Sequence, residues 1–240
     1  LTGDCTVQPH FDYPHAYLAD LPSKLTATGV GRGYRADEAA EQTPPPRKEV
    51  QLRAPLFEQG EKKLTPAEVG TAHHLFMQFC DFDAACAPNG VENELNRLAE
   101  KKILSTEQAY AVDKRKIERF FASDLYKTFM AENKVRREFK FSVLVPVQAY
   151  FPVAADAPEE NVLLQGVIDC LIETGDGFVI LDFKTDRIKK GGAVERAEQY
   201  RPQLAAYARA VHEIYGRPVR ACVLYFFHTG DTEWVSLDET

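Results

Sequence analysis

Two apolar runs joined by a short polar turn predict a β-hairpin in the second half of the chain. The runs are Val162 to Glu173 and Phe178 to Phe183, and the turn is Thr174-Gly175-Asp176-Gly177. Branched and aromatic residues favour strands, and glycine and aspartate favour tight turns. A loop of those turn residues would pair Glu173 with Phe178. The same register sets Asp169 opposite Asp182.

Two carboxylates that face each other in a hairpin need a compensating charge. Their Cβ atoms lie about 4.5–5.5 Å apart, where like charges repel. Asp182 follows the apolar run Phe178-Val179-Ile180-Leu181, which is typical of a buried strand, and an ionised carboxylate there requires a partner. Solvated acids on a surface hairpin are the alternative, but the apolar context favours a divalent metal site. Because side chains alternate along a strand, Lys184 shares a face with Asp182 and borders the same site.

Length and composition predict one large domain with an appended segment. The chain has 240 residues, of which 45% are hydrophobic, enough for a sizeable core. Residues 1–60 contain Gly29 to Gly33 and Pro44-Pro45-Pro46, which favour a linker or arm. We therefore expect the compact domain at 61–240. Since the chain starts at Leu1 without a leader or a long apolar run, we expect a piece of a longer protein and no membrane partner.

The cysteines and the charge narrow the class of protein. Five cysteines without a C-x-x-C pair argue against disulfides, a zinc knuckle or an iron–sulfur cluster, and favour a reducing, cytoplasmic setting. The net charge of −7 is unusual for a nucleic-acid-binding protein. Local basic clusters remain, either as solvated faces or as phosphate contacts: Arg136, Arg137 and Lys140, then Lys184, Arg187, Lys189 and Lys190, then Arg196 and Arg201.

A capped helix is predicted from Pro66 to about Asp81. Thr65 is the N-cap and Glu68 completes a capping box. The apolar stripe of this helix comprises Val69, Ala72, Phe76, Phe79 and Cys80.

The two histidines of this helix fall on different faces. His73 lies near the apolar stripe, so we expect packing or a hydrogen bond rather than metal binding. His74 aligns with Gly70 and Gln78 and is the better site candidate, although a helical histidine alone is a weak indication.

The remaining periodicity predicts helices at 91–103 and 106–122, the latter opened by Thr106, a strand at 135–145, a helix from 194 or 201 to 215, and strands at 219–227 and 233–237. Pro202 implies a new start or a kink in the last helix, with Gly216 as its C-terminal cap. Glu138 lies on the polar side of the 135–145 strand, where a solvated position is favoured over an approach to the metal. This order of elements indicates an α/β fold with a mixed β-sheet.

Five segments carry a family resemblance. The chain resembles the C-terminal nuclease domain of AddA-type helicase–nuclease subunits, in the RecB-like branch of the PD-(D/E)XK nucleases. The matching segments run in family order over about 64–227, and Leu21 to Leu25 resembles the segment that leads into this domain. They are Gly70 to Gln78, Arg137 to Phe141, Gln165 to Asp169, Asp182 to Asp186 and Tyr200 to Tyr207.

The resemblance implies a restriction-endonuclease-like core, a mixed sheet flanked by helices, with site residues of stated roles. His74, Asp169, Asp182 and the carbonyl of Phe183 would coordinate the catalytic metal. Lys184 would serve the attacking water, and Gln203 and Tyr207 would shape the site. Oxygen ligands with one imidazole suit Mg²⁺ or Mn²⁺.

The implied activity is hydrolysis of DNA phosphodiesters, mainly in single strands, during helicase-coupled processing of double-strand breaks for recombinational repair. The implied partners are DNA, helicase domains of the same full-length polypeptide and an AddB-type second subunit. No G-x-x-x-x-G-K-[ST] motif occurs, so we expect no ATP site here. A catalytically silent DNA-end-binding or assembly module is the alternative, and a stand-alone repair exonuclease is disfavoured by the linker-like start.

Overall fold

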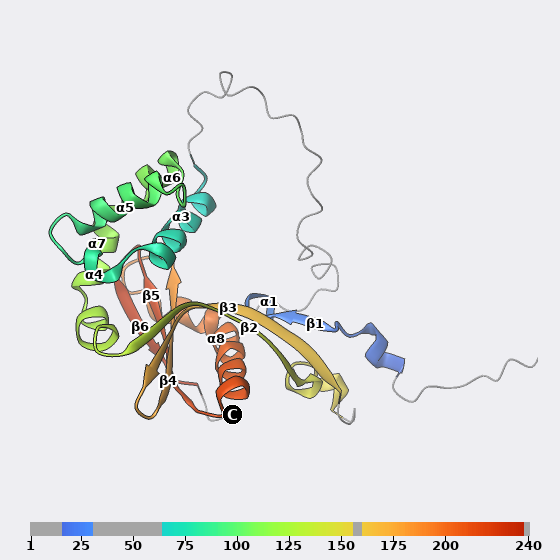
Figure 1. Cartoon of the computed structure of the whole chain (residues 1–240). Coiled ribbons are helices and arrows are strands. Elements are labelled where there is room, and N and C mark those ends of the chain that lie inside the picture. The colour runs from blue at the N-terminus through green and yellow to red at the C-terminus, as the bar shows by residue number, and fades with distance from the viewer. Residues whose placement is uncertain (1–15, 31–63, 156–159, 238–240) are drawn as a thin grey trace, which may run out of the picture.

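The computed structural model describes residues 16–30, 64–155 and 160–237. The predicted α/β class with a mixed sheet is confirmed (Figure 1). The label η marks short 3₁₀ helices, except that η3 is a π-helix. The elements in chain order are η1 (Ala16–Asp20), β1 (Lys24–Thr26), α1 (Ala27–Val30), α3 (Pro66–Phe79), α4 (Phe82–Ala85), α5 (Gly90–Glu100), α6 (Thr106–Ala111), α7 (Lys114–Ala122), η3 (Leu125–Met130), β2 (Lys134–Pro146), η4 (Val147–Ala149), η5 (Pro152–Ala154), β3 (Asn161–Thr174), β4 (Gly177–Lys184), α8 (Ala193–Tyr215), β5 (Val219–Phe226) and β6 (Asp231–Val235).

Strand β3 is the centre of the sheet. The strand order is β1-β3-β4-β5-β6, and β2 pairs with β3 as well. The β1–β3 and β4–β5 pairs are parallel, and the others are antiparallel. On one edge of β3, β1 pairs as far as Gln165 and β4 pairs from Cys170 onward. The short segment between them, which contains Asp169, therefore lies where these two neighbouring strands part.

The predicted hairpin register is confirmed, with a tighter turn than expected. Glu173 pairs with Phe178, and Thr174 also pairs with Gly177, so the turn is Gly175-Asp176 rather than all four predicted residues. Two-residue turns match the twist of hairpin strands. The register is unchanged because the loop closes symmetrically, and it continues to set Asp169 opposite Asp182.

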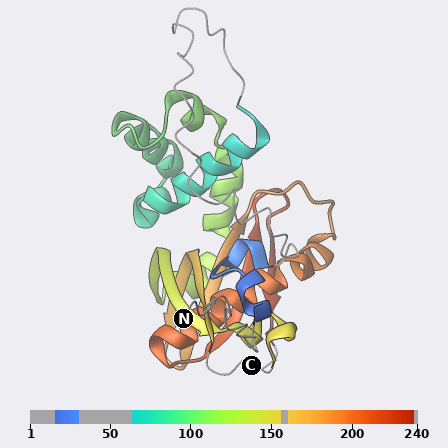
Figure 2. The same ribbon diagram turned by 90° about the vertical axis from the view of Figure 1, so that its right-hand side faces the viewer.

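Two hydrophobic cores cover the two faces of β4. Its Val179, Leu181 and Phe183 join the core beneath α3, α5 and α7, while Phe178 and Ile180 join the core against α8. Figure 2 shows helices α3 to α7 gathered at one end of the sheet. The alternation of one strand thus separates a helical lobe from the long C-terminal helix.

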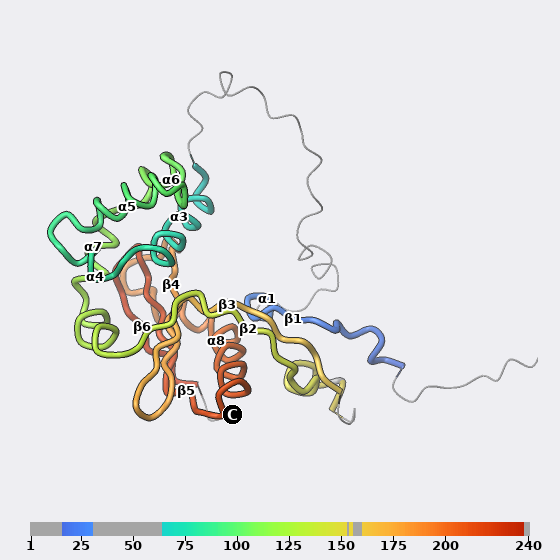
Figure 3. The backbone as a smooth tube through the Cα atoms, in the orientation of Figure 1, coloured from blue at the N-terminus to red at the C-terminus, as the bar shows by residue number. Residues whose placement is uncertain are grey.

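The β2–β3 ribbon is long and curved (Figure 3). Even-numbered β3 residues Leu164 and Ile168 contact the α8 core, whereas Cys170 and Ile172 contact the helical-lobe core. The ribbon therefore changes the face it presents at Asp169. In β2, the facing position is Glu138, whose φ of 50° is uncommon for a residue other than glycine. The change of face coincides with this local distortion.

The helical lobe begins at the predicted capping box. Thr65 and Glu68 exchange the two hydrogen bonds of that motif, and α3 ends at Phe79 with Cys80 as C-cap. Phe79 was predicted in the apolar stripe, but its side chain is 42% exposed. It occupies the last turn, where α3 leaves the core.

The predicted helix 106–122 is wrong because two helices occupy that range. Ser105, not Thr106, is the N-cap of α6 and forms a capping box with Gln108. Asp113 then starts α7 by accepting a hydrogen bond from the backbone of Lys116, and its own backbone N–H donates to His73 Nε2. These contacts end the first helix and begin the second.

Helix α8 is continuous from Ala193 to Tyr215 and includes Pro202. The expectation of a new start at Pro202 was therefore wrong, because the burial of Leu204, Ala206 and Tyr207 against the sheet stabilises the segment despite the missing backbone donor. Gly216 is the predicted cap, with a φ of 62°, the left-handed conformation that favours glycine.

Part of the predicted arm belongs to the sheet. Lys24–Thr26 forms β1 beside β3, and α1 lies near α8 (Figure 1). Gly166 makes this approach possible, because a Cβ atom there would lie 2.6 Å from the ring of Phe141 and 3.2 Å from Ala27. The other residues of the predicted arm, 1–15 and 31–60, lie outside the described residues. Within the described ranges, no helix combines the length and the apolar character needed to span a bilayer.

Candidate active site

The predicted site residues come together where β1 and β4 part. Asp182 and Lys184 come from the end of β4, Asp169 from β3 and His74 from α3. Gly70 allows α3 to approach the end of β4, because a Cβ atom there would lie 2.8 Å from Thr185 Oγ1. Close contact at a glycine therefore brings the histidine-bearing helix to the acidic strand pair.

The two carboxylates are held at the ends of buried strands. Asp182 is 4% exposed, and Lys184 Nζ lies 2.7 Å from its Oδ2 atom. Asp169 Oδ2 accepts a hydrogen bond from the backbone N–H of Phe183 at 2.7 Å. Burial raises the pKa of Asp182, Lys184 lowers it and Asp169 raises it, with a net rise. Asp182 and Lys184 share a side of β4 while Phe183 packs in the opposite core, as the strand alternation predicts.

His74 faces the acids. Its Nδ1 atom lies 3.4 Å from Asp169 Oδ1. Burial lowers the pKa of His74, but Asp169 and Asp182 together outweigh burial, so the net pKa is raised. An imidazole between two carboxylates is therefore available either as a cation or, once deprotonated, as a metal ligand.

His73 turns away from the site, as predicted. Its Nδ1 atom lies 2.8 Å from the carbonyl of Val69, and its Nε2 atom accepts from the backbone N–H of Asp113. That acceptor role places the proton on Nδ1, the neutral tautomer. Burial lowers the pKa of His73. Both ring nitrogens are thus committed to the fold.

Gln203 connects the lysine to the core of α8. Its Oε1 accepts from Lys184 Nζ at 3.2 Å, and its Nε2 donates to Tyr207 Oη at 2.7 Å and to Thr28 Oγ1 at 3.5 Å. Burial raises the pKa of Tyr207, and the charge of Asp182 raises it further. Tyr207 therefore stays protonated.

Glu138 borders the site instead of lying on a solvated strand face. It is half-buried, and its pKa is raised by burial and by the charge of Asp169, against the lowering effect of His74. The favoured prediction for Glu138 was therefore wrong. Its left-handed backbone interrupts the alternation on which that prediction rested.

A second polar network lies directly behind Lys184. Tyr200 Oη donates a short hydrogen bond to Asp186 Oδ2. Arg196 Nε binds the same oxygen at 2.9 Å. Lys184 Nζ lies 3.8 Å from the centre of the Tyr200 ring. The loop after β4 is thus tied to the first half of α8.

The acids and histidine fit a divalent cation by their chemistry. Asp182 Oδ2 is buried, and although Lys184 forms an ion pair with it, no group among the described residues donates a hydrogen bond to it. An orphaned buried oxygen is costly and calls for a partner. No group of three or more His, Cys, Asp or Glu side chains in the described ranges is already gathered as a metal cluster.

Two cavities lie near these elements, and one of them adjoins the site. This cavity, of about 500 Å³, lies between the start of α3 and the loop Thr185-Asp186-Arg187, with Lys116 and His228 on its wall.

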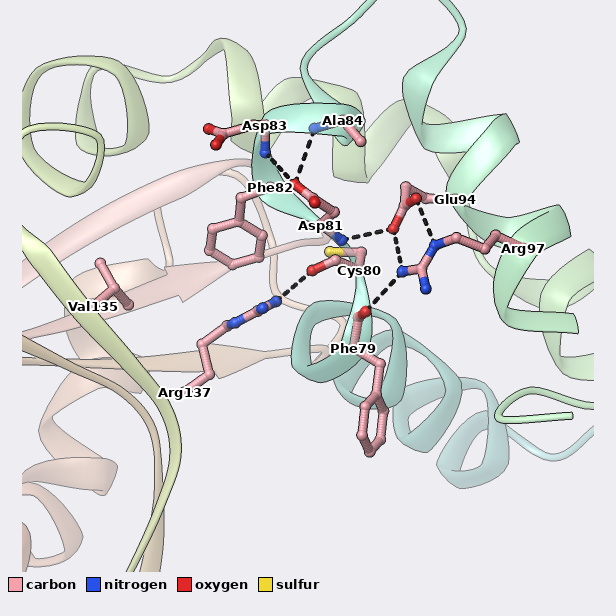
Figure 4. A pocket seen from close by; sticks show the side chains of 10 residues that line it. All are labelled: Phe79, Cys80, Asp81, Phe82, Asp83, Ala84, Glu94, Arg97, Val135 and Arg137. Atoms are coloured by element: carbon pink, nitrogen blue, oxygen red, sulfur yellow. Dashed lines mark hydrogen bonds and ion pairs between the residues drawn. The ribbon is translucent and has the colours of Figure 1, made fainter. Parts of the chain in front are cut away.

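Figure 4 shows the other, of about 630 Å³, between β2 and the helical lobe. There the polar groups satisfy one another: Arg137 donates to the carbonyl of Cys80, and Glu94 binds Arg97 and the backbone N–H of Asp81. We assign the second cavity to structure.

Sequence reasoning missed Thr28 and did not separate Tyr200 from the other inward-facing residues of its helix. Thr28 fell in the predicted arm, although the segment Leu21 to Leu25 just before it was noted as family-like. For Tyr200, the spacing of three and seven residues to Gln203 and Tyr207 was the available signal.

Comparison with known proteins places these residues in a family. A protein-family model described as "PD-(D/E)XK nuclease superfamily" matches residues 47–236. A solved structure described as "Crystal structure of SSO0001" matches with a TM-score of 0.31 and 14% identity, over 60% of this chain and 57% of that one, which is too distant to support an argument.

Several similar proteins are named as one of the subunits of an ATP-dependent helicase/nuclease. The protein of Desulforamulus reducens is 38% identical over 92% of this chain and 18% of its own length. That of Moorella thermoacetica is 40% identical over 91% and 15%, and that of Pelotomaculum thermopropionicum is 36% identical over 96% and 18%. The chain thus spans less than a fifth of the length of these relatives.

Proposed function

The chain belongs to the PD-(D/E)XK nuclease superfamily, and from this premise we propose that it is a metal-dependent DNA nuclease domain. The observation that carries the proposal is the meeting of Asp169, Asp182 and Lys184 around a buried oxygen without a hydrogen-bond donor among the described residues. Perturbed acids in such a setting are typical of catalytic sites.

The proposed metal ligands are His74, Asp169, Asp182 and the backbone carbonyl of Phe183. Carboxylate and carbonyl oxygens with one imidazole suit Mg²⁺, and Mn²⁺ as a substitute. When bound, the ion supplies charge that polarises a phosphate and lowers the pKa of a water molecule. The raised pKa values of His74 and Asp182 describe groups that lose protons when a cation binds.

Lys184 is the proposed partner of the attacking water. The oxygen of water bonds to phosphorus, one P–O ester bond breaks, and the departing oxygen takes up a proton. An ammonium beside the phosphorus stabilises the negative charge that develops during this step. Gln203 supports the ammonium through its carbonyl oxygen, and Tyr207 and Thr28 fix the Gln203 amide.

We extend the proposal to the protein to which this chain is similar. Relatives whose names describe an ATP-dependent helicase/nuclease favour a nuclease domain that follows helicase domains in one polypeptide and receives mainly single-stranded DNA from them during recombinational repair of double-strand breaks. An AddB-type second subunit is part of the same proposal. Four free thiols among the described residues favour a reducing, cytoplasmic setting. The proposed domain includes 61–240 together with β1 and α1.

Cleavage of labelled DNA tests this function. Single-stranded and double-stranded oligonucleotides are incubated with the 240-residue chain in Mg²⁺, in Mn²⁺ or in a chelator. We expect metal-dependent cleavage, and Asp182→Asn should reduce its rate by about a hundredfold or more because the site loses a charged group. Asp176→Asn makes the same chemical change in the exposed turn of the same hairpin and should leave the rate unchanged.

Two results would count against this function. Equal rates in Asp182→Asn and the wild type would remove the acidic pair from the mechanism. DNA binding without cleavage under every metal condition would favour the silent end-binding or assembly module.

A further inference from the structure

We infer that Tyr200 is a positioning residue for Lys184, holding the ammonium over its ring so that it points into the acidic site. This inference rests on the proposed function, because it assigns Tyr200 a role through the lysine that serves the water. The carrying observation is the 3.8 Å distance from Lys184 Nζ to the centre of the Tyr200 ring. A cation at this distance is attracted by the negative face of the ring.

Lysine needs such a restraint more than most residues. Its ammonium sits on four flexible methylene groups and has three N–H donors. The side chain of Lys184 is 12% exposed, so water supplies few partners. Asp182 Oδ2 at 2.7 Å and Gln203 Oε1 at 3.2 Å give two directions of attraction. The ring of Tyr200 gives the third.

The ring is the contact for which no ligand competes. Asp182 is itself a proposed metal ligand, so its hold on Lys184 weakens when its charge is shared. Gln203 is fixed by Tyr207 and Thr28 and limits the position of the nitrogen from one side. The aromatic face remains available in either state.

Tyr200 is itself immobilised by the loop that follows Lys184. Its hydroxyl donates to Asp186 and accepts from Arg196 Nη2 at 3.3 Å, while Arg196 Nε binds Asp186 at 2.9 Å. Burial raises the pKa of Tyr200 to about 12, and Asp186 adds to the rise. The hydroxyl therefore remains a donor at neutral pH, and its role is to fix the ring plane.

The first test measures the position of Lys184 without DNA or metal. The rate of acylation of each lysine by an amine reagent is followed by peptide mass spectrometry in the wild type, Tyr200→Phe and Tyr200→Leu. Loss of one partly desolvated cation–π contact should accelerate acylation of Lys184 about threefold to thirtyfold in Tyr200→Leu. Tyr200→Phe keeps the ring and should stay near the wild-type rate. Lys189, exposed in the next loop, is the internal control and should not change.

The second test separates the ring from the hydroxyl in cleavage. Phenylalanine with zero, one, two or three ring fluorines is placed at position 200. Fluorine withdraws charge from the ring face while size and the missing hydroxyl stay constant, so the logarithm of the cleavage rate should fall steadily with each fluorine. A structural filler would show no such trend.

Three outcomes overturn the inference. The first is unchanged Lys184 acylation in Tyr200→Leu. The second is a Tyr200→Phe variant that behaves like Tyr200→Leu, because the hydroxyl network alone would then matter. The third is a flat fluorine series in an active enzyme. If the wild type cleaves no DNA, the proposed function fails, while the acylation pattern still decides whether the ring holds Lys184.

Discussion

Asp182 Oδ2 and Tyr225 Oη are both fully buried oxygen atoms without a hydrogen-bond partner among the described residues, and their surroundings give them different meanings. Asp182 lies beside Lys184 and shares its field with Asp169 and His74, so its free valence fits a ligand. Tyr225 lies in an aromatic cluster, 4.9 Å between ring centres from Phe120 and 5.2 Å from Phe227. Its hydroxyl only costs stability there.

Tyr225→Phe should therefore stabilise the protein. Removing an unsatisfied buried hydroxyl should raise the free energy of unfolding by about 1 kcal/mol, a rise of about 2–4 °C in melting temperature for a domain of this size. Tyr126→Phe is the matched control, because the Tyr126 hydroxyl interacts with Cys86, and it should bring no gain. A lower melting temperature for Tyr225→Phe would show that its hydroxyl has a partner.

At the scale of elements, local patterns predicted what depends on neighbours in sequence. The capping box of Thr65 and Glu68, the register of the hairpin and the division of His73 from His74 all follow from helical or strand periodicity. Thr28 could not be found in this way, because its partner Gln203 lies 175 residues away. Glu138 was misplaced because its φ of 50° breaks the alternation that a strand pattern assumes.

The joint between α3 and α5 gives a prediction about acid. Glu94 is 4% exposed and binds Arg97 and the backbone N–H of Asp81. The hydrogen bonds from Arg97 lower its pKa, and burial opposes them. The unfolded state, with a Glu pKa of about 4.3, therefore holds this proton more tightly. The stabilisation is full above that pH and is lost as pH falls through the folded value.

Glu94→Gln should lower the free energy of unfolding by about 2 kcal/mol at pH 7, since hydrogen bonds to a charged group are lost. Urea unfolding at several pH values should show the gap from wild type narrowing below about pH 4. Glu100→Gln, exposed at the end of the same helix, should match wild type throughout. A gap that stays constant from about pH 7 to about pH 3 would contradict the ionised pair.

At the scale of the whole molecule, the site is assembled from segments spread over most of the chain. Thr28, His74, Asp169, Asp182 and Gln203 come from α1, α3, β3, β4 and α8. The long curved β2–β3 ribbon joins the helical lobe to the α8 side, so the fold must be complete before the site exists. The sequence predicted the order of these elements, while their meeting point depends on glycine contacts at Gly70 and Gly166.

The central claim is that these side chains hold a divalent cation, and calorimetric titration with Mn²⁺ tests it most directly. Wild type and His73→Gln should bind Mn²⁺ with similar affinity, since His73 is committed to the fold. His74→Gln and Asp182→Asn should bind about tenfold or more weakly, with thermal melting checked for each variant. Absence of Mn²⁺ binding by the wild type, or loss of binding in His73→Gln with binding retained in His74→Gln, would contradict the account.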